Sequence, residues 1–197
     1  VQWATSIGGT SNDYGRGIAT DSSGNVYVIG EYSGTLTIGS TTLTGAGSDD
    51  VFVAKYDTSG TFQWAESIAG TGNNIGYGIA TDSNGNVFVT GKYSGDLNLA
   101  YNAYLTSAGS TDAFVIKYDT LGTVQWARSI GGANITQGQG IATDSGGNVY
   151  VTGGYSGSVT IGSISFDSAG GFDAFVVKYD TSGTVQWAAS IGGGSSI

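Results

Sequence analysis

Four tryptophans, Trp3, Trp64, Trp126 and Trp187, lie 61, 62 and 61 residues apart in this chain. Around them recur VQW or FQW, GIATD, GNVYV or GNVFV, YSG and DxFVxKYD. A fixed period of this length is the signature of a repeat architecture, in which neighbouring units share one continuous core. Positions that are identical in every copy are therefore required by the repeat. Positions that differ between copies are free to serve another purpose.

The composition narrows the class of protein. Hydrophobic residues make up 39% and charged residues 11%, which is too apolar for a disordered chain despite 36 glycines. The formal net charge of −9 argues against a nucleic-acid partner, whose binding surface would be basic. No apolar run is long enough for a membrane-spanning helix, so membrane insertion is not expected.

Cysteine, histidine, methionine and proline are all absent. The lack of cysteine excludes disulfides and thiolate metal sites, and the lack of histidine and cysteine removes the usual nucleophile–base pairs. We expect no enzyme activity, no cofactor and no metal. Because the chain starts at Val1 inside a repeat motif and has no Met, we expect a processed, excised or engineered segment.

Each repeat reads as four short strands joined by tight turns. In the second copy these are GIATD (78–82), VFVTGKY (87–93), DAFVIKYD (112–119) and TVQWARSI (123–130), called strands a, b, c and d. They are rich in Val, Ile, Phe, Tyr and Thr, and Gly, Asn, Asp and Ser lie between them. Four antiparallel strands per repeat are typical of a β-propeller blade. A β-solenoid is the alternative, but its repeats are normally shorter.

Recurring polar residues are interpreted as structural. Asp and Gly recur in the a–b and c–d turns, where Asp can accept backbone N–H bonds and Gly can adopt positive φ. They are not calcium ligands, because the loops lack the alternating oxygens and closing Glu of an EF-hand. The recurring Lys55, Lys117 and Lys178 of strand c are expected to pair with a recurring Asp. Trp64 and Trp126 are expected to be largely buried.

The motifs WAxSIGG, GIATDSxGNVYVTG, YSG and DAFVVKYDTSGTVQW resemble the SBBP-type bacterial β-propeller repeat. The resemblance covers essentially the whole chain. It implies a secreted or cell-surface bacterial protein whose repeats serve scaffolding and interaction, and it carries no catalytic residues over. The expected organisation is one propeller region, 1–197, with a leading strand d (1–9) and repeats at 10–70, 71–132 and 133–197.

Three blades form an open arc, whereas propellers have at least four blades. We therefore expect the ring to be completed by oligomerisation, with a dimer of six blades favoured, or by further repeats of a longer chain. The surplus strand d complicates the dimer, because segments 1–9 and 185–193 would compete for the same position beside a strand c.

The d–a and b–c connections hold nearly all the differences between the copies, and the strand order places them on one side of the arc. We expect this side to contact a partner, either a protein or a glycan. Tyr, Asn and Gly suit adaptable contacts, including stacking on sugars; solvated loops that vary without function are the alternative. The candidate partner-binding residues are Tyr14, Arg16, Asn73, Asn74, Tyr77, Tyr101, Tyr104, Asn134, Gln137, Gln139 and Phe172.

The leading functional hypothesis is a non-enzymatic structural or adhesive interaction module, located outside the cell or on a bacterial surface. A carbohydrate-binding, lectin-like propeller is the second hypothesis. A glycan-active hydrolase is a weak third, because Asp is plentiful but no spacing indicates a catalytic carboxylate pair.

Overall fold

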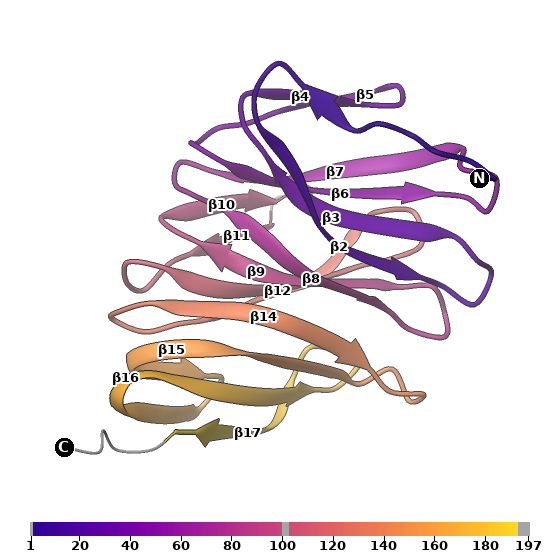
Figure 1. Cartoon of the computed structure of the whole chain (residues 1–197). Coiled ribbons are helices and arrows are strands. Elements are labelled where there is room, and N and C mark those ends of the chain that lie inside the picture. Colours follow the sequence, from indigo (N-terminus) through magenta and orange to yellow (C-terminus); the bar gives the residue numbers. More distant parts are fainter. Residues whose placement is uncertain (1, 100–102, 193–197) are drawn as a thin grey trace.

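The computed structural model describes residues 2–99 and 103–192, and it confirms the all-β fold. Three antiparallel four-stranded blades follow one another along the chain (Figure 1). Blade 1 consists of β2 (Asp13–Thr20), β3 (Val26–Tyr32), β6 (Asp50–Tyr56) and β7 (Phe62–Gly70). Blade 2 consists of β8 (Ile75–Thr81), β9 (Val87–Tyr93), β12 (Asp112–Tyr118) and β13 (Val124–Ile130). Blade 3 consists of β14 (Thr136–Thr143), β15 (Val149–Ile161), β16 (Ile164–Tyr179) and β17 (Val185–Ile191).

The core lies between the blades. Strand c of the middle blade, β12, is buried along nearly its whole length because blades 1 and 3 cover its two faces. Ile29 and Val51 of blade 1 pack with Phe114 and Ile116 of blade 2 in one hydrophobic cluster. Phe88 of blade 2 belongs to a second cluster with residues of blade 3. The blades are therefore held together by apolar side chains that alternate along the strands.

Each b–c connection contains a second hairpin, which was not predicted from the sequence. In blade 1 this hairpin is β4 (Thr35–Ile38) with β5 (Thr41–Thr44), and in blade 2 it is β10 (Asp96–Leu99) with β11 (Ala103–Thr106). In blade 3 the outer parts of β15 and β16 form it, with Ile161 opposite Ile164.

Each inserted hairpin reaches back to strand d of the preceding blade. Leu97 and Asn98 of β10 pair with Gly70 and Ala69 of β7. Gly131, just after β13, forms an isolated bridge with Thr160 of β15. Leu97 is fully buried, so the hairpin adds core as well as backbone pairing. This second connection between blades explains the TLTI, DLNL and SVTI patterns, which have the period-2 alternation of half-buried strands.

The leading strand d is present as only two paired residues, β1 (Gly8–Gly9), which pair with β4. Its tryptophan nevertheless takes the place expected for a blade preceding blade 1. Trp3 stacks on Tyr56 with ring centroids 6.2 Å apart and lies directly over Gly60. Residues 4–7 form no strand, because no strand c within residues 2–99 and 103–192 lies beside them.

Trp64 and Trp126 join consecutive blades, and most of the surface of both side chains is covered, as expected. Both are partly exposed at the outer edge of the interface. The indole N–H of Trp64 donates to the Thr120 carbonyl in the c–d turn of blade 2, at 3.2 Å. Trp126 makes the equivalent bond to Thr181 of blade 3, also at 3.2 Å.

Lys55 and Lys117 bind the same carbonyls, and none of the three recurring lysines forms a salt bridge with an aspartate among the described residues. The predicted pairing of lysine with aspartate is wrong. Lys55 Nζ donates to the Thr120 carbonyl at 3.1 Å, and Lys117 Nζ donates to that of Thr181 at 3.3 Å. Each ammonium also lies over an aromatic ring of its own blade, 5.3 Å from the Tyr27 centroid for Lys55. A lysine and a tryptophan that lie opposite each other in the strand register thus both donate hydrogen bonds to one turn carbonyl of the next blade. We call this pair the clasp.

Residues 2–99 and 103–192 contain no helix that is long and apolar enough to span a membrane.

Candidate functional site

The strand pairing gives the arc two sides of different character. One side carries the a–b and c–d turns (21–25, 57–61, 82–86, 119–123, 144–148 and 180–184), and we call it the turn side. The other carries the d–a connections (8–17, 69–78 and 131–140) and the b–c connections (33–49, 94–99 with 103–111, and 156–172), and we call it the loop side.

The turn side is built by recurring hydrogen bonds. In the a–b turn of blade 3, Asp144 Oδ1 accepts the backbone N–H groups of Gly146 and Asn148, and Oδ2 accepts the Asn148 side chain. These donors, led by the Asn148 amide, lower the pKa of Asp144 to about 2. Gly147 takes φ of +77°, which a glycine adopts without steric cost. The interpretation of these Asp and Gly residues as turn-forming is confirmed.

The loop side contains a charged cluster at the junction of blades 1 and 2. Arg16 Nη2 donates to Glu31 Oε1 at 2.5 Å, and the guanidinium lies 5.3 Å from the Tyr14 ring centroid. Glu31 is buried, and its Oε2 has no hydrogen-bond partner among the described residues. Burial raises the pKa of Tyr77, and the nearby Glu31 carboxylate raises it further. Tyr14, Arg16 and Tyr77, expected on one surface, are thus brought together around a carboxylate.

Glu31 was not among the candidate residues. It could have been identified because its position differs in every copy of a strand that otherwise recurs: the equivalent residues are Lys92 and Gly154. Gly154 is partly exposed and Lys92 is only partly buried. The charged cluster is therefore specific to the first two blades.

The predicted asparagines have mainly structural contacts. Asn74 is fully buried and donates to Asp50 Oδ1 at 2.9 Å, so its prediction as a partner-binding residue is wrong. Asn73 donates to Asp49 Oδ2 at 3.1 Å and ties two connections together. Asn134 is exposed, and its carbonyl accepts the Ser110 hydroxyl at 3.2 Å. Of the two glutamines, Gln139 is exposed and Gln137 is partly buried.

Three aromatic rings on the loop side are largely exposed. Tyr104 on β11 has 72% of its surface accessible, Phe172 on β16 has 58% and Tyr14 on β2 has 50%. Rings at such exposure can stack on a flat apolar surface or on a sugar ring. Tyr101, the remaining aromatic candidate, lies outside the described residues.

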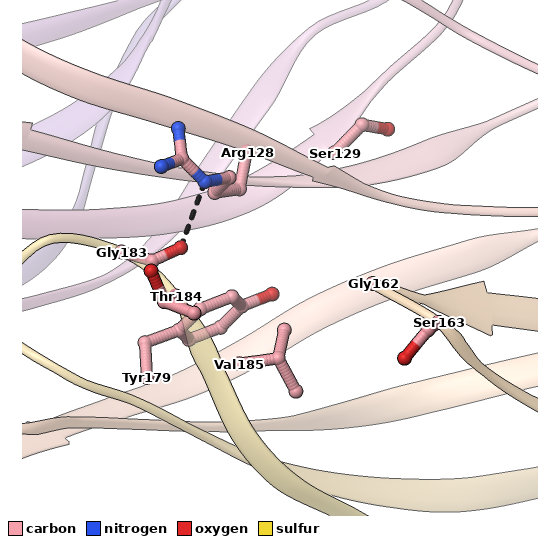
Figure 2. A pocket seen from close by; sticks show the side chains of 8 residues that line it. All are labelled: Arg128, Ser129, Gly162, Ser163, Tyr179, Gly183, Thr184 and Val185. Atoms are coloured by element: carbon pink, nitrogen blue, oxygen red, sulfur yellow. Dashed lines mark hydrogen bonds between the residues drawn. The ribbon is translucent and has the colours of Figure 1, made fainter.

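A cavity of about 370 Å³ opens at the outer edge between blades 2 and 3 (Figure 2). Arg128 enters it from β13, and Ser163 and Val185 approach from blade 3. Arg128 Nε donates to the Gly183 carbonyl at 2.8 Å, and Nη2 donates to that of Ser182 at 3.1 Å. With Nη1 bound to the Ala127 carbonyl, every guanidinium nitrogen is occupied by backbone, so Arg128 fastens blade 3 to blade 2.

Across 2–99 and 103–192, no group of three or more His, Cys, Asp or Glu side chains is placed to hold a metal ion. Burial raises the pKa of Asp112, but this carboxylate accepts the Ala108 N–H at 2.8 Å and lies against Gly131. It anchors the b–c connection to strand d.

Comparisons with known proteins agree with this fold. The family model of the SBBP beta-propeller repeat matches residues 2–31, 63–97 and 125–154. The chain is similar to an uncharacterized WD repeat-containing protein, L264, of Acanthamoeba polyphaga mimivirus, with 27% identity over 98% of this chain and 16% of that protein. It is also similar to the regulatory protein FlaEY of Caulobacter vibrioides, with 34% identity over 87% of this chain and 18% of that protein.

The chain thus spans less than a fifth of the length of these two relatives. Among solved structures it is similar to a protein of unknown function from Bacteroides caccae, at 12% identity and a TM-score of 0.30, covering 90% of this chain and 82% of that one.

Proposed function

Because the chain is a β-propeller protein built from SBBP repeats, we propose that it is a non-enzymatic structural or adhesive interaction module that binds a partner through its loop side. One observation carries the proposal. Among the described residues, the three most exposed aromatic rings, Tyr14, Tyr104 and Phe172, all belong to the variable loop side, whereas the turn side is built mainly from residues that recur in every copy. Function in a propeller is expected in such surface segments, because the fold itself fixes no chemistry.

The contacts on the loop side favour adaptable binding over catalysis. Tyrosine and phenylalanine offer large contact areas with few rotatable bonds, so they lose little entropy when a partner binds. Arg16 remains partly exposed while it bonds Glu31, which holds a cation in place at the surface. A positioned cation beside Tyr14 suits an acidic or aromatic group on a protein partner.

A carbohydrate ligand is the second candidate. It is favoured by Tyr104, whose ring stands on the inserted hairpin β10–β11 with most of its surface exposed. An isolated exposed tyrosine ring of this kind can stack on a sugar face. The extracellular or bacterial cell-surface location implied by the repeat is part of the same proposal, and labelling intact source cells with an antibody against the chain tests it.

The test of the proposed function is a cell-binding assay with beads that carry the purified protein. Wild-type beads are expected to bind intact source cells. Tyr104→Ala and Phe172→Ala are each expected to lower binding by about fivefold or more, the loss typical of an aromatic residue central to an interface. Leu121→Ala is the matched control, because Leu121 is 78% exposed but lies on the turn side.

Treating the cells separates the two partner classes. Protease treatment that abolishes binding supports a protein partner, and periodate oxidation that abolishes it supports a glycan. Binding lowered as much by Leu121→Ala as by Tyr104→Ala, with all variants folded, would contradict a binding site confined to the loop side.

A further inference from the structure

Among residues 2–99 and 103–192, no blade covers the outer face of blade 3, and this face has the features of one half of a blade interface. Thr152 is exposed, whereas its equivalent in blade 2, Thr90, is fully buried. Trp187 has 43% of its surface exposed, whereas Trp126 is only partly exposed under the turn of blade 3. The equivalent faces of blades 1 and 2 are each covered by the facing side of the next blade.

The face of blade 1 that looks away from blade 2 is the complementary half. Ile18 has 70% of its surface exposed, whereas the equivalent Ile79 has 9% because it packs on blade 1. The recipient of Ile79 is Gly17, where an added Cβ would lie 3.3 Å from Ile79 Cγ2. Ile141 packs against Gly78 in the same way, with its Cγ2 3.2 Å from a Cβ added at Gly78. Each blade thus inserts an isoleucine against a glycine of the preceding blade.

The next glycine in this series is Gly140, and within residues 2–99 and 103–192 a Cβ added there would lie near only the Thr152 side chain, at 3.2 Å from its Cγ2. Instead a hollow of about 310 Å³ lies there, lined by Gly140, Ala142, Tyr150, Thr152 and Val176 together with Ile141 and Val151. The exposed Ile18 would therefore fit against Gly140 in this hollow, as Ile79 packs against Gly17. The chain therefore presents both halves of its own internal interface at its two ends.

The clasp shows the same relation at the outer edge. Lys117 and Trp126 donate to the Thr181 carbonyl, but the equivalent Lys178 and Trp187 have no hydrogen-bond partner within residues 2–99 and 103–192. In blade 1 the equivalent carbonyl is that of Thr58, in the c–d turn. Among the described residues, no lysine donates a hydrogen bond to it.

The leading segment, residues 2–9, already occupies part of the blade 1 face. Trp3 lies over Gly60, where an added Cβ would be 2.5 Å from its ring, as Trp126 lies over Gly183 at 2.7 Å. β1 pairs with β4 in the way that β7 pairs with β10. The segment imitates strand d of a preceding blade at the outer edge, and it leaves Ile18 uncovered.

We propose that a second copy of this chain docks head-to-tail on these faces, with Ile18 of each copy in the Gly140 hollow of the other. Trp187 of the partner copy then takes the place of Trp3 over Gly60, so residues 2–9 act as a built-in competitor that must leave. Two arcs related by a two-fold axis close a ring of six blades, which lies within the range of known propellers. This closure uses the two end faces and does not depend on the loop side.

Sedimentation of matched variants tests the proposal. Because the competitor lowers the fraction of binding-competent chains, removing residues 1–9, or the change Trp3→Ala, is expected to lower the dimer dissociation constant by about tenfold or more. Ile18→Asp in the truncated chain is expected to restore the monomer. Leu121→Asp is the control, since Leu121 is equally exposed but lies away from both end faces.

A cross-link then tests the geometry, since the chain has no cysteine of its own. Ile18→Cys combined with Gly140→Cys is expected to give a covalent dimer on oxidation, and Gly17→Cys with Ile79→Cys, equivalent positions within one chain, is the positive control. A truncated chain that stays monomeric at about 100 µM, a concentration about a hundredfold above a micromolar dissociation constant, would overturn the proposal. Equal dimerisation with and without residues 1–9 would overturn the competitor role, and open ladders larger than a dimer would overturn the six-bladed ring.

Discussion

The indole of Trp126 packs against Gly183 of the following blade, and a Cβ added at Gly183 would lie 2.7 Å from the ring. Its N–H at the same time donates to the Thr181 carbonyl at 3.2 Å. Trp64 has the same relation to Gly122 and Thr120. The tryptophans that mark the repeat thus join blades to one another, and each recurs because the glycine turn that it covers recurs one blade later.

Trp126→Ala is expected to lower the free energy of unfolding by about 2–3 kcal/mol, somewhat less than for a fully buried tryptophan because the side chain is partly exposed. Trp187→Ala is the matched control, since it has the same strand position but no following blade. It is expected to cost about 1 kcal/mol or less. Urea denaturation at a concentration where the protein is monomeric measures both. Equal losses would show that the tryptophan stabilises its own blade rather than the next interface.

The fold could be predicted from the sequence because the repeat gives the same pattern three times. The strands, the Asp and Gly turns and the buried strand c follow from local preferences and from period-2 alternation. The inserted hairpins were missed because β10 is stabilised by pairing with β7, a strand of the preceding repeat. Local sequence does not state which distant strand will lie beside it.

The candidate site was predicted less well, since exposure depends on neighbours across blades. Asn74 and Tyr104 both lie in variable segments, yet one is fully buried on Asp50 and the other is 72% exposed. The clasp was not predicted because Lys55 donates to a backbone carbonyl. Every residue has such a carbonyl, so the residue types do not reveal which one is bound. Variation between copies located the loop side, but it did not distinguish contacts between blades from surface.

Glu66→Gln is expected to raise the melting temperature at pH 7. Burial raises the pKa of Glu66 above its ordinary value, so its charged form is disfavoured in the folded state. That penalty is present above the folded-state pKa and is absent below the unfolded-state pKa of about 4.3. The gain should therefore shrink as the pH falls towards about 4. Glu31→Gln is the control and should lower stability, because Glu31 bonds Arg16. A gain from Glu66→Gln that does not change with pH would contradict this explanation.

Asp144→Asn is expected to lower the melting temperature at neutral pH, because an amide has only one accepting oxygen. With that oxygen on the backbone N–H groups, the amide nitrogen cannot accept from the Asn148 side chain and the Tyr150 hydroxyl, which both donate to Asp144 Oδ2. The pKa of Asp144 is lowered to about 2, so its carboxylate stabilises the fold above the unfolded-state value and this stabilisation is lost as the pH falls to about 2. Thermal unfolding followed by circular dichroism at several pH values measures the difference from wild type. It should be largest near pH 7 and small near pH 2; a constant difference would contradict the titration of this turn.

The separation of a loop side that binds from a turn side that folds is tested most directly by measuring cell binding and melting temperature together for Tyr104→Ala and Gly85→Val. Tyr104→Ala is expected to lose binding and to keep the wild-type melting temperature, because its ring is exposed. Gly85→Val is expected to lower the melting temperature, since Gly85 has φ of +76° and a β-branched residue is strained there, and to keep binding at temperatures where it remains folded. Loss of binding in both variants at unchanged melting temperature would contradict the account.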